Sequence, residues 1–145
     1  MPGTTAVLAA LERILRERVL VLDGGMGTML QRHKLGEPDF RGERFKDHPR
    51  DLKGNSDVLV LTRPDIVEGI HDAYFEAGAD LVETNTFSGT VIGQADYALE
   101  PFVYEINVAA SRIARRAADA WTARTPDRPR FVAGSMGPTN KTLSI

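Results

Sequence analysis

The chain has 145 residues, of which 42% are hydrophobic and 26% are charged, which is the composition of a globular protein with a core of its own. The formal net charge is −2 and no run of Lys and Arg is longer than a pair, so we expect no nucleic-acid partner. The sequence contains no cysteine, which excludes disulfides and thiolate metal ligands. No apolar run approaches the ~18 residues of a membrane span, and the charged N-terminal segment is unlike a secretory signal. We therefore expect a cytoplasmic protein with no membrane partner.

The first predicted elements are a helix and a short buried strand. Thr4 or Thr5 is suited to cap a helix that runs to about Glu17, because apolar residues recur at helical spacing in this segment. Val19 to Leu22 is a continuous apolar run and predicts a buried strand. Residues 24–55 are rich in turn formers, and long loops of this kind are often functional or mobile.

The rest of the chain predicts amphipathic helices that alternate with strands. Thr62 and Asp65 have the spacing of a capping box for a helix that ends near Ala77, and Gly78 is a natural residue to follow its end. The later elements are expected at residues 80–86 (strand), 101–124 (helix) and 130–135 (strand). Strands that alternate with helices in this way predict parallel βαβ units with right-handed crossovers.

Small and polar residues follow each predicted strand. In parallel α/β folds the carboxyl ends of the strands form the face that binds ligands, so three coincident strand ends are informative together. The three stretches are Asp23-Gly24-Gly25, Glu83-Thr84-Asn85-Thr86 and Gly134-Ser135-Met136-Gly137-Pro138-Thr139-Asn140.

Position alone leaves the roles of the two carboxylates open. Asp23 is equally suited to hold a substrate ammonium group, with glycines that let the ligand approach, or to cap the next turn. Glu83 is suited to bind a substrate amine, although an internal ion pair with Lys or Arg is the simpler expectation.

Other site patterns are weak or absent. The stretch GGMG fails as a dinucleotide fingerprint, because Leu30 stands where the third glycine would be needed. His33, His48 and His71 lack metal-ligand spacing and are expected to be surface or packing residues. Residues 54–56 predict a turn.

Several long segments carry a family resemblance. RVLVLDGGMGTMLQ, DFRGERF, DLKGNSDVLVLTRPD, HDAYFEAGADLVETNTF and the stretch from INVAASRIARR to FVAGSMGPTNKTLSI closely resemble the homocysteine S-methyltransferase family. FRGERF and DLKGN point within that family to its cobalamin-dependent methionine synthases. The resemblance covers the chain from Arg18 to Ile145.

The resemblance implies a (β/α)8 TIM barrel of the homocysteine S-methyltransferase type. Such a barrel needs ~250 residues, so this chain is expected to hold only roughly the first three βα units. Residues 1–17 would be a leading helix and residues 18–145 the first part of the homocysteine-binding barrel domain.

The implied reaction transfers a methyl group from methylcobalamin, and originally from methyltetrahydrofolate, to zinc-activated homocysteine to give methionine. The implied partners are homocysteine and the methyltetrahydrofolate and cobalamin modules of a parent chain. Because the zinc thiolates and the cobalamin module are missing here, we expect no bound cofactor, no metal ligand and no methyl transfer by this chain alone.

The resemblance also assigns substrate contacts at the three strand ends. Asp23 would lie near the amino group of homocysteine, and the other assignments would line the pocket. The expected substrate-binding residues are Asp23, Gly24, Gly25, Glu83, Thr84, Asn85, Gly137 and Thr139.

Two other functions stay open from the sequence. The missing cysteines favour a non-catalytic binding or interaction module derived from the same fold. A different barrel enzyme, such as an aldolase that uses Glu83 or Lys141, is weaker because nothing near Lys141 would depress its pKa. Whichever function holds, the strand at residues 130–135 is expected to have an unpaired edge, and this predicts that the chain associates with itself.

Overall fold

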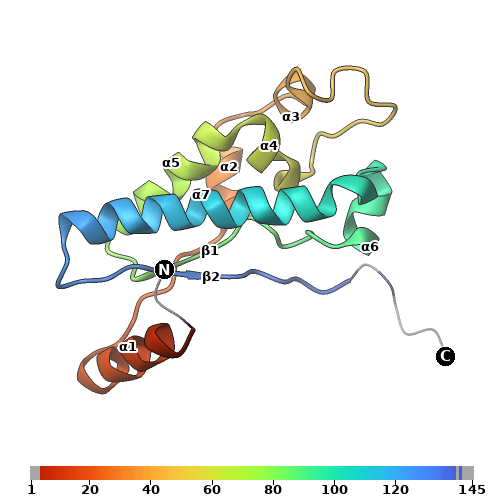
Figure 1. Cartoon of the computed structure of the whole chain (residues 1–145). Helices are drawn as coiled ribbons and strands as arrows, with labels where there is room; N and C mark the ends of the chain where they lie inside the picture. Colours follow the sequence, from red (N-terminus) through yellow and green to blue (C-terminus); the bar gives the residue numbers. More distant parts are fainter. Residues whose placement is uncertain (1–3, 140, 142–145) are drawn as a thin grey trace.

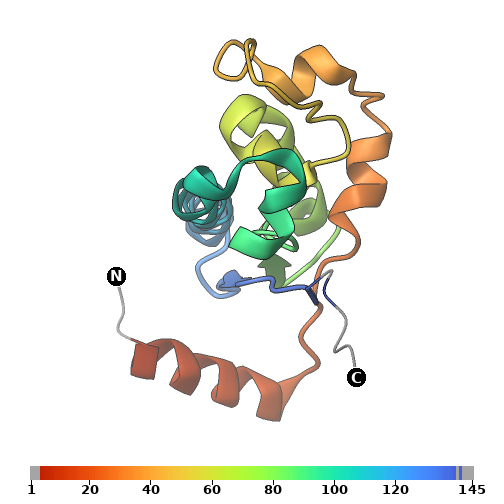
Figure 2. The same ribbon diagram turned by 90° about the vertical axis from the view of Figure 1, so that its right-hand side faces the viewer.

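The computed structural model describes residues 4–139 and 141. Its elements in chain order are α1 (Thr4–Glu17), α2 (Met26–Gln31), α3 (Glu37–Arg41), η1 (Ser56–Val58), α4 (Leu59–Thr62), α5 (Pro64–Glu76), β1 (Leu81–Glu83), α6 (Val91–Gln94), η2 (Ala95–Tyr97), η3 (Glu100–Phe102), α7 (Val103–Arg124) and β2 (Phe131–Ala133). Helices α5 and α7 lie on one side of the strands, and α1 lies on the other (Figure 1, Figure 2). Within the described part of the chain, no helix has the length and apolar character needed to cross a bilayer.

The sheet is parallel, as the alternation of strands and helices predicted. Strands β1 and β2 pair in register from Leu81 opposite Phe131 to Glu83 opposite Ala133. On the other side of β1, Leu22 makes a single parallel bridge to Leu81. The spatial order is therefore the segment at Leu22, then β1, then β2, which brings three chain segments to one edge with the same direction.

The expectation of a buried first strand at Val19 to Leu22 is wrong. The exposed fractions are 81% for Val19 and 50% for both Val21 and Leu22. The backbone of this segment is held, since the Val21 carbonyl accepts hydrogen bonds from Asp80 N at 2.7 Å and Leu81 N at 3.1 Å. Apolar continuity predicted cover on both faces, but these three side chains stay at least half exposed in the described structure.

Helix α5 has the predicted end and a different beginning. Gly78 has φ +104°, a conformation that favours glycine, and its N–H donates to Phe75 O while Ala79 N donates to Tyr74 O. The predicted capping box is wrong, because Thr62 is the last residue of α4 and its hydroxyl donates back to Val58 O at 3.5 Å. The side chains of Thr4 and Thr5, predicted as caps for α1, lie outside the described residues.

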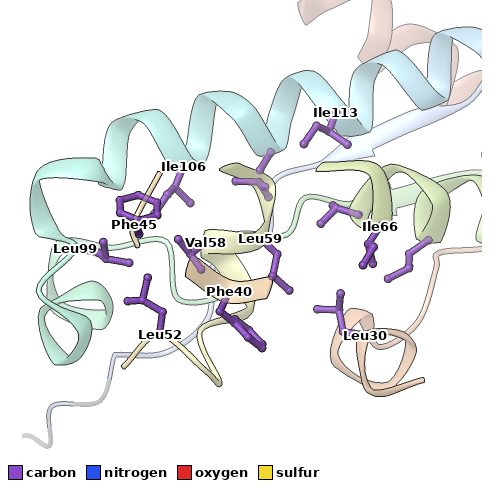
Figure 3. Close-up of a cluster of buried hydrophobic side chains, with 14 residues drawn as sticks. Leu30, Phe40, Phe45, Leu52, Val58, Leu59, Ile66, Leu99, Ile106 and Ile113 are labelled. Atoms are coloured by element: carbon purple, nitrogen blue, oxygen red, sulfur yellow. The ribbon is translucent and has the colours of Figure 1, made fainter. Parts of the chain in front are cut away.

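The main core fills the space between the short helices and α7. Figure 3 shows labelled side chains from α2, α4, α5 and α7 converging on one cluster, among them Leu30, Leu59 and Ile106. The long segment predicted as loop also contributes to this cluster through α3 and the residues that follow it. It is therefore anchored by the buried residues Phe40, Phe45 and Leu52.

A second cluster attaches the sheet to the helices. Val82 of β1 and Phe75 of α5 are almost fully buried against the alanine face of α7, where Ala114 lies. His71 is fully buried in α5, and burial lowers the pKa of its ring to about 4. It is thus a neutral packing residue, as the sequence predicted.

One buried carboxylate joins the amino ends of the strands. Asp80 has no exposed surface and accepts hydrogen bonds from both terminal nitrogens of Arg18 at 2.8 and 2.9 Å, from Val21 N at 2.9 Å and from Arg128 Nε at 3.0 Å. Burial alone would raise the pKa of Asp80, but these donors hold it well below its usual range.

We expect Asp80→Ala to lower the free energy of unfolding by about 3 kcal/mol, because a buried ion pair that loses one partner leaves its donors unsatisfied. Equilibrium urea unfolding measures this loss. Arg13→Ala is the matched control, since Arg13 and Glu17 form an exposed pair at 3.3 Å and such pairs contribute about 0.5 kcal/mol or less. Equal effects of the two substitutions would contradict the role assigned to Asp80.

Candidate functional site

A cleft of about 580 Å³ lies at the carboxyl ends of the strand segments. The residues that follow Leu22, β1 and β2 form one part of its wall. The other part comes from the turn before η1 and from the loop and short helices after β1. The wall residues that carry the argument below are Asp23, Gly24, Gly25, Asn55, Ser56, Asp57, Glu83, Thr84, Asn85, Phe87, Ser88 and Ser135.

The structure brings most of the predicted substrate contacts together and leaves two outside. Residues 23–25 and 83–85 line the cleft, whereas Gly137 and Thr139 do not. Gly137 donates its N–H to Phe87 O at 2.9 Å, and a Cβ at Gly137 would lie only 2.6 Å from that oxygen. Its role in the structure is thus to pack against Phe87, which does line the cleft. Thr139 is exposed, and Asn140 lies outside the described residues.

Asp23 is held in place by β1. Both of its carboxylate oxygens lie 3.1 Å from Glu83 N, and its own N–H donates to Leu81 O at 3.0 Å. It does not cap the next turn, because Gly25 is the N-cap of α2 and makes no side-chain cap. Burial raises the pKa of Asp23 to about 6, the Glu83 N–H opposes this, and the Glu83 charge adds to it.

The glycines after Asp23 allow an aromatic side chain to approach the backbone. A Cβ on Gly24 would lie 3.2 Å from the hydroxyl of Tyr74. That hydroxyl donates to Gly25 O at 3.3 Å. Tyr74 of α5 therefore supports the turn that carries the Asp23 carboxylate.

Thr84 joins the ends of the two strands. Its hydroxyl oxygen accepts Ser135 N at 3.0 Å and lies 2.7 Å from the hydroxyl of Thr86, which itself donates to Ser135 O at 2.8 Å. The Thr86 proton is thus committed to the carbonyl, so Thr84 is the donor between the two hydroxyls. Thr84, predicted as a substrate contact, is fully engaged in positioning the wall of the cleft.

The turn at residues 54–56 contributes more than sequence reasoning predicted. Asn55 is buried, donates to Gln94 Oε1 at 2.7 Å, and accepts from Val58 N at 3.3 Å as the N-cap of η1. Gln94 Nε2 donates in turn to Ser88 O at 3.1 Å. The available signal was the stretch Asn-Ser-Asp directly before an apolar run, which is typical of a helix start.

Asp57, which sequence reasoning also missed, is a buried carboxylate of the cleft wall. Its exposed fraction is 4%, and Oδ2 accepts Ser88 N at 3.2 Å. Its other oxygen, Oδ1, is buried and has no hydrogen-bond partner among the described residues. Burial raises the pKa of Asp57 to about 6, and the N–H groups of Ser88 and of Asp57 itself partly offset this.

The cleft is acidic. The carboxylates of Asp23, Asp57, Glu83 and Asp96 line it, and within the described ranges no Lys, Arg or His does. Such a wall favours a ligand with a positively charged group. Lys141 is exposed and is not a wall residue, so the structure gives no support to a Schiff-base lysine in this cleft.

The residues present do not fit the thiolate zinc site that the resemblance implied. The sequence has no cysteine. Among residues 4–139 and 141, no group of three or more His, Asp or Glu side chains is arranged to hold a metal ion.

The structure is a helix-rich α/β fold with a small parallel sheet and a polar cleft at the carboxyl ends of its strands. The sequence profile of the homocysteine S-methyltransferase family matches residues 20–145, and the chain belongs to this family.

Solved structures agree with this assignment. The oxidized form of the homocysteine methyltransferase MmuM from Escherichia coli has a TM-score of 0.68 and 26% identity over 88% of this chain. Its metallated form gives 0.68 and 25% over 88%, and its apo form, which supports the fold alone, gives 0.60 and 23% over 90%. The chain spans only 40% to 41% of the length of these proteins.

We expect Thr84→Val to cost roughly 1–2 kcal/mol in the free energy of unfolding, because it leaves the part-buried Ser135 N–H and the buried Thr86 hydroxyl without this partner. Chemical denaturation followed by circular dichroism measures the loss. Thr139→Val, at an exposed position, is the control and should be nearly neutral. If Thr84→Val were also neutral, the connection between the strand ends would not depend on this hydroxyl.

Proposed function

We propose that this chain supplies the amino-acid-anchoring face of a homocysteine S-methyltransferase, and more specifically of a cobalamin-dependent methionine synthase. The observation that carries the proposal is the acidic cleft at the carboxyl edge of the sheet, in a chain that belongs to this family. The FRGERF and DLKGN segments support the choice of methionine synthase within the family.

The cleft is suited to one end of an amino-acid substrate. Asp23 accepts hydrogen bonds from the ammonium group of homocysteine. Among the described residues that line the cleft, no Lys, Arg or His pairs with its desolvated carboxylate. No cationic side chain in the described wall is available for the substrate carboxylate. That group is therefore bound by neutral donors, such as backbone N–H groups.

Zinc and cobalamin belong to the proposed parent enzyme. In that enzyme a metal ion would keep the substrate sulfur as a thiolate by depressing its pKa. This chain has no cysteine to bind such a metal, so no step of methyl transfer is assigned to its residues. Methyltetrahydrofolate and cobalamin modules are partners of the parent, and this chain alone is expected to be inactive.

A second candidate is a non-catalytic binding module with the same anchoring face. The lack of cysteine favours it. Both candidates bind homocysteine. They differ in whether the chain yields methionine when it is combined with a barrel segment that carries the zinc cysteines, with zinc and with a methylcobalamin donor.

We expect Asp23→Asn to weaken homocysteine binding by about tenfold or more, because a neutral amide loses the charge-assisted bond to the ammonium group. Isothermal titration calorimetry measures the dissociation constant. Asp51→Asn is the control, because the Asp51 side chain is 89% exposed and lies outside the cleft. Unchanged binding by Asp23→Asn would refute the proposed role.

The affinity for homocysteine is also expected to depend on pH, through the protonation of Asp23. The pKa of Asp23 is about 6, so below pH 6 the carboxylate takes up a proton and wild-type affinity falls. The substrate amino group stays protonated from pH 5 to 7, since α-amino groups titrate near ~7.7–8.0 or higher. Asp23→Asn is expected to lose part of this dependence.

We also propose that the chain associates with itself through the exposed apolar segment at Val19 to Leu22, which lies at one edge of the sheet. Val19, Val21 and Leu22 are at least half exposed, and exposed apolar patches beside a sheet edge favour association. Sedimentation should show a dimer or larger species that Val21→Lys shifts towards monomer. Tyr104→Lys, at an exposed aromatic on α7, should leave it unchanged. A monodisperse wild-type monomer with cooperative unfolding would contradict the proposal.

A further inference from the structure

Asp57 is a carboxylate of the cleft wall to which the proposed function gives no role. It comes from η1, far in sequence from the strand ends that carry Asp23 and Glu83. Its backbone position is fixed, because Asn55 caps η1 and Asn85 Nδ2 donates to Ser56 O at 2.7 Å. Its side chain therefore enters the wall from a rigid support.

The protein satisfies only half of this carboxylate. Ser88 N donates to Oδ2 at 3.2 Å, whereas Oδ1 is buried without a partner in the described part of the chain. The neighbouring amides direct their N–H groups elsewhere: Asn55 to Gln94, and Gln94 to Ser88 O. A buried carboxylate oxygen without a donor among the described residues is stabilised in its charged form by a donor from another molecule.

We propose that Asp57 is a second ammonium-binding residue of the cleft, which selects ligands with a primary amino group by accepting a hydrogen bond at Oδ1. The inference rests on the proposed function only in taking the amino group of homocysteine as the ligand group concerned. It adds a specificity-determining residue to the site that Asp23 begins.

The chemistry of the wall favours an ammonium group with N–H donors over a quaternary ammonium group or a divalent metal ion. An oxygen that lacks a hydrogen-bond donor is satisfied by N–H, which a quaternary ammonium group does not have. A divalent metal ion requires several oxygen ligands, and the described residues contain no group of three or more acidic or histidine side chains arranged for one. The absence of Lys and Arg from the described wall leaves the charge of Asp57 to the ligand.

The first test uses the full, unmodified chain. The ¹³C resonance of the Asp57 carboxyl carbon is followed through a pH titration with L-homocysteine, with its desamino analogue 4-mercaptobutanoate, and without ligand. We expect homocysteine to lower the titration midpoint by about one unit, equivalent to tenfold preference for the ionised form, and the desamino analogue to leave it in place. An equal midpoint in all three titrations would overturn the proposal.

The second test is Asp57→Asn, which keeps an acceptor for the Ser88 N–H and removes the charge. We expect about tenfold weaker binding of homocysteine, unchanged binding of 4-mercaptobutanoate, and a melting temperature no lower than that of wild type. Asp51→Asn serves again as the exposed control. If Asp57→Asn does not fold, the carboxyl titration of the wild-type chain decides alone.

The outcomes separate this inference from the proposed function. If L-norleucine binds as tightly as homocysteine and depends equally on Asp57, the inference stands and the thiol-specific function fails. If homocysteine binds Asp57→Asn as it binds wild type, the inference fails and the proposed function stands. A folded chain that binds no amino acid overturns both.

Discussion

The arrangement of this chain depends on one fully buried carboxylate at the amino edge of its sheet. Asp80 receives Arg18 from the segment after α1, Val21 N from the first extended segment, and Arg128 from the connection between α7 and β2. Three chain segments are thereby fixed at one end in a common direction. Because the strands are short and parallel, fixing their amino ends also determines where their carboxyl ends emerge. The position of the cleft follows from that constraint and from the bonds of Thr84 at the other edge.

The helical layer could be predicted because its information is local. The apolar stripe of α7 and the glycine at position 78 are sufficient to place two helices and one helix end, and both are where the pattern predicted. The burial of Val19 to Leu22 could not be predicted, since it depends on whether other segments cover the sheet. The beginning of α5 was misplaced for a related reason: Thr62 and Asp65 have capping-box spacing, but α4 already occupies Thr62.

The cleft residues that come directly after a strand in the sequence could be predicted. Those that only packing brings to the cleft could not. Asp23 and Glu83 were found because a strand end is recognisable from its apolar run. Asp57 was missed, because only the fold brings η1 to the same cleft, where one of its oxygens has no donor from the described residues. Gly137, predicted as a substrate contact, does not line the cleft, and its lack of a side chain serves the contact with Phe87. The acidic character of the wall is likewise a property of the assembled cleft rather than of any one stretch.

The Asp80 cluster also determines the order in which this chain acquires structure. Its ion pairs join residues separated by 62 positions for Arg18 and 48 positions for Arg128. Closing such loops costs conformational entropy before any contact compensates, whereas helices α5 and α7 form from neighbours in sequence. We therefore expect the helices to associate early and the sheet to be completed last. The cleft, which exists only once the strands are aligned, is then among the latest parts of the molecule to form during folding.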